Sequence, residues 1–297
     1  MPQASQVCAD SWLSLANQSH ELTDGALAGC ECLDDPEAGW IPEDSEEAGG
    51  SSRVSRRNHY GIHIRLAGYH RQPANACRSK ELPIAIDISV EQLADAIGAA
   101  TIEVNDQERR IAVSLWNLLA EGDPVTPAGL TAGSAVAETI VNDALDRWPG
   151  IFRDEEGHVV GFWGLAIPPM SHRFQAEGGK PIHAWCALDP FLIVPVIGRT
   201  ARVESKDPVT GEPISMTVTP NGISDVSPTS VVVSFLVPDK PFDQQVLQSF
   251  CNFVHFFASR ESAERWAKGR NGIALLSVDD AFEVGRRASR IFGEPIP

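Results

Sequence analysis

The sequence predicts an α+β protein in which a helical, winged-helix-like domain precedes a domain of mixed strands and helices. Two observations carry this prediction. Apolar residues recur at helical spacing behind capping residues in the first folded part, and strand-like and helix-like runs follow one another without regular βαβ alternation in the second. Ahead of both lies an extension that we expect to be disordered. The predicted boundaries are 1–80 for the extension, 84–167 for the winged-helix-like domain and 181–297 for the mixed domain.

The N-terminal extension is defined by its charge. Residues 1–52 contain eleven acids and no Lys or Arg, whereas residues 53–80 contain seven Lys or Arg and no acid. Neither stretch shows sustained periodicity, and such segments bury too little apolar surface to offset chain entropy. We therefore expect a flexible extension, acidic and then basic. A start site placed upstream of the true initiator is the alternative.

Four helices and two strands are expected in the winged-helix-like domain, because capping residues and Gly or Pro mark the helix ends. The helices run from Ser89 to Gly98, from Asn105 or Asp106 to Gly122, from Thr126 and Pro127 onward, and from Ser134 to Pro149 and Gly150. Strands at 151–153 and 158–167 follow around an Asp-Glu-Glu-Gly turn. Helices followed by such a hairpin have the outline of a winged helix.

A winged helix invites the interpretation that the domain reads DNA, but the charge argues against it. The helix at 135–148 carries Glu138, Asp143 and Asp146 against one Arg147 and one Asn. Groove-reading helices normally present several Arg, Lys, Asn or Gln side chains. The whole chain has a net charge of −16, the opposite of what phosphate binding requires. We expect this domain to pack against or cover a site, with no nucleic acid as partner.

The mixed domain should begin with a hairpin. Strands are expected at 200–206 and 214–220 around an Asp-Pro-Val-Thr-Gly turn, and at the β-branched run 229–237. The run 253–257 is short and apolar, and Ser259 and Ser277 are expected to cap two helices, the second reaching Ile291.

No feature of the sequence indicates a membrane or an export route. No apolar run approaches the roughly 18–20 residues that cross a bilayer. The first thirty residues lack a basic region followed by an apolar stretch, so no secretory signal is visible. We expect a soluble, cytoplasmic protein.

Two of the six cysteines fall in the folded part, at Cys186 and Cys251, and the other four lie in the extension, at Cys8, Cys30, Cys32 and Cys77. If a helix begins near Cys186, that thiol and the carboxylate of Asp189 share one face. The carboxylate could then move protons to and from sulfur, and apolar neighbours would raise both pKa values. The alternative is a buried cysteine that acts as a small hydrophobe, with Asp189 at a helix start.

Taken together, Cys186 and Cys251 do not form a familiar zinc or redox site, because neither belongs to a Cys-x-x-Cys pair. Two thiolates and one carboxylate suit a soft metal of low coordination number, such as Hg(II) or Cu(I). His255 is either a further ligand or a core histidine in an aromatic run.

Around these residues the sequence resembles the alkylmercury lyase (organomercurial lyase) family of bacterial mercury resistance. The resemblance spans roughly residues 85–297 and leaves 1–80 unmatched. The similar blocks are Ala-Trp-Cys-Ala-Leu-Asp at 184–189, Ile-Gly-Arg-Thr-Ala-Arg-Val at 197–203, Thr-Gly-Glu-Pro at 210–213, Ser-Phe-Cys at 249–251, Val-His-Phe-Phe-Ala-Ser at 254–259 and Ser-Val-Asp-Asp-Ala-Phe at 277–282.

The resemblance implies that the domain at 181–297 is catalytic and cleaves the carbon–mercury bond by protonolysis, giving a hydrocarbon and Hg(II). It implies that Cys186, Cys251 and Asp189 are the residues that contact mercury, and that Asp189 also carries the proton. It implies no organic cofactor, since mercury is substrate and product. The expected partners are the organomercurial, small thiols and a mercuric reductase that takes Hg(II).

Two departures from the family pattern concern cysteines outside the Cys186, Asp189 and Cys251 set. A cysteine that some members carry after the Ala-Arg-Val block is absent from the turn at 204–207, and one that follows the second catalytic cysteine is Asn252 here. In the extension, Cys30 and Cys32 could collect mercurials or could be an incidental pair.

Two other functions remain open from the sequence. One is a metal-responsive winged-helix transcription regulator, which needs metal affinity but no proton carrier. The other is a metal-binding homologue that has kept the fold without the reaction.

Overall fold

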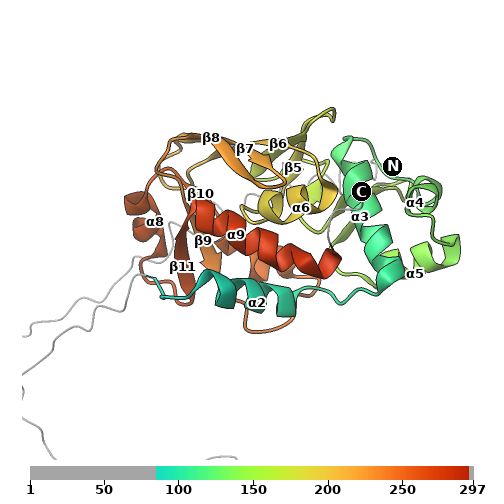
Figure 1. Ribbon diagram of the computed structural model, residues 1–297, viewed down its shortest axis with the longest axis horizontal. Coiled ribbons are helices and arrows are strands. Elements are labelled where there is room, and N and C mark those ends of the chain that lie inside the picture. Colours follow the sequence, from blue (N-terminus) through green and yellow to red (C-terminus); the bar gives the residue numbers. More distant parts are fainter. Residues whose placement is uncertain (1–84, 294–297) are drawn as a thin grey trace, which may run out of the picture. The chain divides into compact units, whose positions relative to one another are not determined.

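A computed structural model describes residues 85–293 of the chain (Figure 1). The predicted extension, including Cys30 and Cys32, lies outside the described residues. The described elements mix helices and strands, which confirms the predicted α+β class. Its helices are α2 (Val90–Ala100), α3 (Asp106–Ala120), α4 (Pro127–Ser134), α5 (Glu138–Arg147), α6 (Asp189–Ile197), α7 (Val246–Ser249), α8 (Arg260–Ala267) and α9 (Val278–Ala288), with 3₁₀ turns η1 (Cys251–Phe253) and η2 (Ser289–Phe292).

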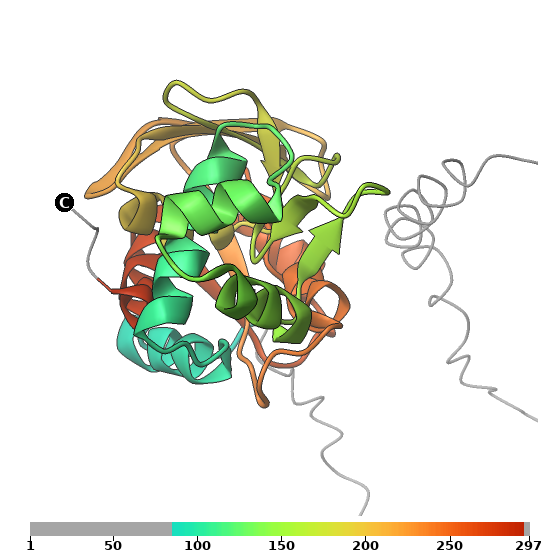
Figure 2. The same cartoon turned by 90° about the vertical axis from the view of Figure 1, so that its right-hand side faces the viewer.

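The first three helices begin where the capping residues predict. Ser89 and Asn105 each accept a backbone N–H in a capping box, and Thr126 accepts the Gly129 N–H ahead of Pro127. Seen from the end at which α3, α4 and α5 gather, these helices lie beside a β-hairpin (Figure 2). This part of the chain therefore has the predicted winged-helix outline.

The fourth helix begins later than predicted. Ser134 does not cap it but is the last residue of α4, and its buried hydroxyl has no hydrogen-bond partner. Ala135 then takes the left-handed conformation, with φ +52°, and α5 starts at Glu138 without a side-chain cap. A serine followed by apolar residues at helical spacing predicts the start of a new helix. The sequence alone does not show that this serine is instead the last residue of the preceding helix, α4.

Eleven strands in the described part form two antiparallel sheets. The larger sheet has the order β1-β2-β3-β5-β4-β6-β7-β8, and the smaller one β10-β9-β11. The strands are β1 (Ile151–Arg153), β2 (Val159–Phe162), β3 (Leu165–Ala166), β4 (His172–Ala176), β5 (Ile182–Ala184), β6 (Ala201–Lys206), β7 (Pro213–Thr219), β8 (Gly222–Ser227), β9 (Val232–Leu236), β10 (Phe256–Phe257) and β11 (Ile273–Ser277).

The strands confirm part of the sequence prediction and correct part of it. The hairpin of β6 and β7 and the buried strand β9 are where they were expected. The single strand predicted at 158–167 is instead two strands, because Trp163 and Gly164 turn the chain between β2 and β3. The short apolar run at 253–257 contains the strand β10, which a 3₁₀ turn precedes.

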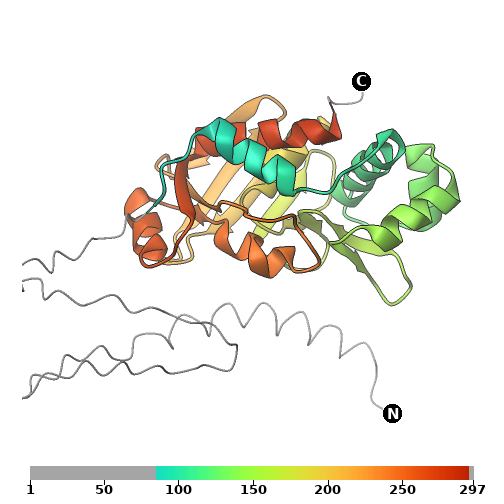
Figure 3. The same ribbon diagram turned by 90° about the horizontal axis from the view of Figure 1, so that it is seen from below.

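Helix α9 is packed between α2 and α6. Figures 1 and 3 show α2 and α9 running side by side, and α6 contacts α9 as well. A Cβ at Gly285 of α9 would lie 2.6 Å from the Cβ of Phe191 in α6, so only glycine permits this close approach. The packing holds α6, whose first residue is Asp189, in a fixed place against the core.

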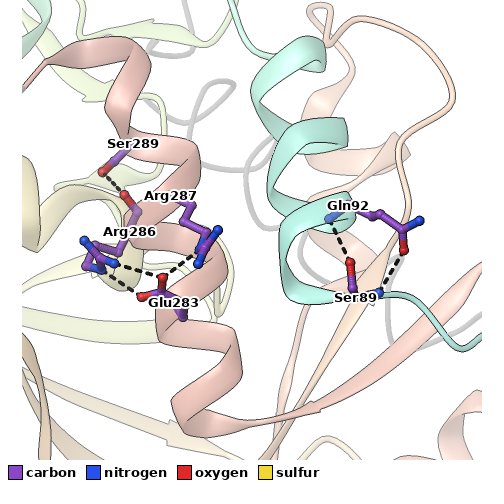
Figure 4. A network of polar contacts seen from close by, with 6 residues as sticks. All are labelled: Ser89, Gln92, Glu283, Arg286, Arg287 and Ser289. Carbon is purple, nitrogen blue, oxygen red and sulfur yellow. Dashed lines mark hydrogen bonds and ion pairs between the residues drawn. The ribbon is translucent and has the colours of Figure 1, made fainter.

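The ends of α2 and α9 are satisfied locally (Figure 4). Ser89 and Gln92 exchange hydrogen bonds at the start of α2. Near the end of α9, Glu283 accepts hydrogen bonds from Arg286 and Arg287, and Ser289 donates to the Arg286 carbonyl. Cations in the last turn are favourable because they face the negative end of the helix dipole. Within residues 85–293, none of the helices has the length and apolar character needed to span a membrane.

One carboxylate ties the β6–β7 hairpin to the rest of the domain. Asp207 is 1% exposed, accepts the Ala258 N–H and the Ser262 hydroxyl at 2.8 Å each, and also accepts the N–H groups of Val209 and Thr210. Burial alone would raise the pKa of Asp207, but these hydrogen bonds outweigh it and lower the pKa.

We predict that Asp207→Ala lowers the free energy of unfolding by about 3 kcal/mol, because buried donors left unpaired cost about 1–3 kcal/mol each. Denaturant titration measures the change. Glu212→Ala is the control, since it removes the same charge from an exposed position in the same hairpin, and it should stay within about 0.5 kcal/mol of wild type. Equal effects of the two substitutions would contradict the proposed tie.

Candidate active site

Cys186 lies in the turn that joins β5 to α6. It is 1% exposed, and Asp189 is the first residue of the helix. Cys186 is therefore not inside a helix as the i, i+3 argument assumed, but the two residues are still in contact. The backbone N–H of Cys186 donates to Oδ2 of Asp189 at 2.6 Å, and the Cys186 thiol also hydrogen-bonds to this carboxylate.

Cys251 reaches the same place from a distant part of the chain. It begins the 3₁₀ turn before β10, and its thiol is hydrogen-bonded to that of Cys186. The Ala187 N–H donates to the Val254 carbonyl at 3.1 Å, which joins the two cysteine segments directly. Ser234 of β9 completes the attachment, because its buried hydroxyl donates to the Phe253 carbonyl at 2.8 Å. Tertiary packing thus brings both thiols and the carboxylate of Asp189 together.

The environment shifts all three ionisable groups. Burial raises the pKa of Asp189 to about 7, although hydrogen bonds from Cys186 and Trp185 oppose the shift. Burial, the hydrogen bond to Cys251 and the charge of Asp189 raise the pKa of Cys186 well above its usual value. For Cys251 the hydrogen bond from Cys186 lowers the pKa, while burial and the charge of Asp189 together outweigh it and leave the pKa raised. Cys251 is therefore the thiol that the hydrogen bond favours as a thiolate.

A small cavity opens onto Asp189 and Cys251. It encloses about 30 Å³, and apart from these two residues and Thr101 its wall is apolar or glycine. The wall is formed by Ile97, Thr101, Trp163, Gly164, Trp185, Leu188, Asp189, Leu192, Phe242, Val246, Phe250 and Cys251. Asp189 is partly exposed, but the surface it keeps faces this apolar space, which explains its raised pKa.

Sequence reasoning missed the turn of Trp163 and Gly164, which lines this cavity. Gly164 has φ +101°, and a Cβ there would lie 2.7 Å from the carboxyl carbon of Asp189. Only glycine therefore leaves room for the carboxylate. The available signal was a glycine inside a strand-like run, which often marks a close approach of another group.

His255 was open as a further ligand or a core histidine. Its Nε2 lies 2.8 Å from the Asn252 carbonyl, its ring packs edge-on against Trp266, and it is not among the residues of the cavity wall. Burial lowers its pKa to about 4. Its position suits the core interpretation, in which the imidazole holds the turn after Cys251.

The arrangement has the chemistry of soft-metal capture with proton transfer. Two sulfurs can bind one soft ion, and a carboxyl group with a pKa near 7 can both accept and donate a proton at neutral pH. Cys251 and Asp189 face the cavity and Cys186 lies directly behind them.

Comparisons with known proteins show which family the chain belongs to. Residues 165–289 match the family model described as alkylmercury lyase, and residues 90–163 match the helix-turn-helix domain of alkylmercury lyase. The chain is 38% identical over 183 residues to the alkylmercury lyase of Staphylococcus epidermidis, covering 62% of this chain and 83% of that protein. It is 40% identical over 185 residues to the alkylmercury lyase of Bacillus cereus, covering 62% and 82%.

A solved structure shares the fold. The crystal structure of the mercury-bound form of MerB2 matches with a TM-score of 0.55 and 20% identity, covering 69% of this chain and 99% of that one. The helix-turn-helix match precedes the lyase match, in the order that the helices and sheets take here. From the two family models and these relatives, the chain belongs to the alkylmercury lyase family.

Proposed function

We propose that the protein is an organomercurial lyase that cleaves the carbon–mercury bond of alkyl- and arylmercury by protonolysis. The observation that supports this proposal most directly is a pair of hydrogen-bonded thiols, one of them also hydrogen-bonded to a carboxyl group of pKa about 7, beside an apolar cavity. A site that only stores metal has no need of a group that changes protonation near neutral pH.

Capture comes first. Cys251 faces the cavity, and its thiolate is stabilised by the hydrogen bond from Cys186. The thiolate displaces the thiol or halide carried by R–Hg⁺, so a sulfur–mercury bond forms and the old ligand leaves with its electron pair. The apolar wall takes up the organic group, which favours the bound substrate over water.

Proton transfer follows. Cys186 gives its proton to the carboxylate of Asp189 and binds mercury as a second thiolate, which raises the electron density on mercury and on its carbon. The Asp189 carboxyl then delivers that proton to the carbon. The electron pair of the carbon–mercury bond takes the proton, R–H leaves, and Hg(II) stays on the two sulfurs while Asp189 returns to the carboxylate.

Release requires outside sulfur, since two thiolates hold Hg(II) strongly. We propose that small thiols or a mercuric reductase take the ion, and that the reaction uses no organic cofactor. We also propose no nucleic acid partner, because α5 exposes Glu138, Asp143 and Asp146. A cytoplasmic location fits this exchange with intracellular thiols.

Substitution of the three residues tests the roles. We predict that Cys186→Ser, Cys251→Ser and Asp189→Asn each reduce turnover of methylmercury at least about 10³-fold, because each removes a group that acts in the transition state. The measurement is methane and Hg(II) released in excess thiol. Asp95→Asn, an exposed acid on α2, should leave turnover unchanged.

Wild-type protein that binds methylmercury but releases neither product would contradict the lyase proposal. That result would favour the alternative of a metal-binding homologue without the reaction. Retardation of DNA at physiological salt would favour the metal-responsive transcription regulator.

The reaction should depend on pH through Asp189. The free enzyme needs this group as a carboxylate to accept the Cys186 proton, and its pKa is raised to about 7. Capture also needs the Cys251 thiolate, whose pKa is raised as well, so we predict that kcat/KM keeps rising with pH above about 7 and falls by a further factor of about ten for each pH unit below about 7. A profile that stays flat down to pH 5 would contradict the assignment of Asp189.

The same shift predicts a stability effect that needs no substrate. Because the folded-state pKa of Asp189 lies above its ordinary value of 3.8, the folded state binds more protons between these values, and stability falls as pH rises through them. Between pH 5 and pH 8 the wild type should lose about 2–3 kcal/mol relative to Asp189→Asn. Denaturant titration of both proteins at the two pH values measures this, and an unchanged difference would show that Asp189 is not shifted.

A further inference from the structure

Trp163 has a backbone conformation that tryptophan rarely adopts. Its φ is +30°, and Gly164 follows with φ +101°. A bulky residue in the left-handed region costs on the order of 1–3 kcal/mol and persists only where the surrounding structure holds it in place. Such strain often marks a functional site.

Two hydrogen bonds from the winged-helix part hold Trp163. The indole N–H of Trp116, a fully buried residue of α3, donates to the Trp163 carbonyl at 3.1 Å. The indole N–H of Trp163 donates to the carbonyl of Pro149, two residues after α5, at 2.8 Å. Both the main chain and the ring of Trp163 are thus fixed.

Trp163 and Phe242 both line the cavity beside Asp189 and Cys251, and their ring centroids are 6.0 Å apart. Phe242 lies in the segment between β9 and α7, which is neither helix nor strand there. That segment is attached near the cavity by the Phe242 N–H to the Ala100 carbonyl at 2.7 Å, and by the Gly150 N–H to Gln244 at 3.3 Å. Of the two rings, Trp163 is the one whose side chain is itself hydrogen-bonded.

The cavity is too small for a large organic group. Its volume of about 30 Å³ compares with about 150 Å³ for a protein cavity that binds benzene. Any organomercurial must widen this cavity to enter it. The most rigid part of the cavity wall therefore limits the size of the organic group. Two residues of the cavity wall have hydrogen-bonded indole rings, Trp163 and Trp185, and Trp163 is the one held in a strained turn by the winged-helix part.

We infer that Trp163, supplied by the turn between β2 and β3, sets the size of the organic group that the site accepts, and favours small alkyl over aryl groups on mercury. The inference rests on the proposed lyase function. It makes the winged-helix part of the chain a contributor to substrate selection, through a residue that touches the substrate without taking part in proton transfer.

The test compares kcat/KM for methylmercury and phenylmercury in wild type, Trp163→Ala and Trp163→Phe. Removing a wall group changes discrimination in an apolar pocket by about 10–200-fold. The phenyl-to-methyl ratio should therefore rise at least about tenfold in Trp163→Ala and by less in Trp163→Phe. Trp266→Ala is the matched control, since Trp266 is also half-buried but does not line the cavity, and its ratio should equal that of wild type.

Binding separates this inference from the proposed function. Retention of phenylmercury relative to methylmercury against excess thiol, measured by mass spectrometry, should also rise in Trp163→Ala. Wild type that releases neither methane nor benzene would overturn the lyase function, and retention would then decide the size limit alone. A ratio within twofold of wild type in both Trp163 variants, or an equal rise in Trp266→Ala, would overturn the inference. If Trp163→Ala does not fold, Trp163→Phe decides it.

Discussion

A carboxyl group placed in an apolar wall is the constraint on which the rest of this structure depends. Asp189 needs a low-polarity surrounding to keep its pKa near 7, yet a carboxylate with no hydrogen-bond donor there would be very costly. The fold supplies the Asp189 carboxylate with a few hydrogen-bond donors in fixed positions. Asp189 lies at the N-terminus of α6, where the helix dipole favours its charge, and accepts the Cys186 N–H at 2.6 Å. Gly164 leaves the room that the carboxylate occupies.

The two β-sheets position the thiols of Cys186 and Cys251 next to each other. The large sheet delivers Cys186 at the end of β5, and the small sheet anchors the Cys251 turn through Ser234 of β9. The hydrogen bond from Ala187 to Val254 joins the segments. A soft metal ion with two sulfur ligands needs both in one place before it arrives, and this packing supplies that preorganisation.

The winged-helix part has a role in this site that its outline does not suggest. Counted by segment, the net charge of −16 is −11 for residues 1–52, +7 for 53–80, −10 for 81–180 and −2 for 181–297. The acidic character of 81–180 opposes a nucleic-acid function. Instead, α3 and the Pro149 carbonyl after α5 fix Trp163, so this part forms one wall of the cavity. Residues 181–297 have a net charge of only −2, so the charge of this part does not favour a substrate of either sign.

The sequence by itself determined the local structure and the chemistry-bearing residues. Ser89, Asn105 and Thr126 predicted helix starts because capping is a local interaction, and β9 was predicted from its β-branched residues. Cys186, Asp189 and Cys251 were singled out from their residue types and spacing, and their roles were assigned from the resemblance, since two short blocks carry them. The helix start predicted at Ser134 was wrong because the end of α4 depends on how α4 and α5 pack. The strands β4 and β5 were not predicted because they are only five and three residues long.

Only the tertiary structure decided what surrounds those residues. The pKa of Asp189 follows from apolar side chains contributed by α2, α6 and the segment before Cys251, and no local pattern places them together. The contact of Gly164 with Asp189 and the strained turn at Trp163 join parts of the chain that sequence reasoning treated separately. Local preferences select helices and strands residue by residue, whereas a cavity and the ionisation of its groups arise from long-range packing.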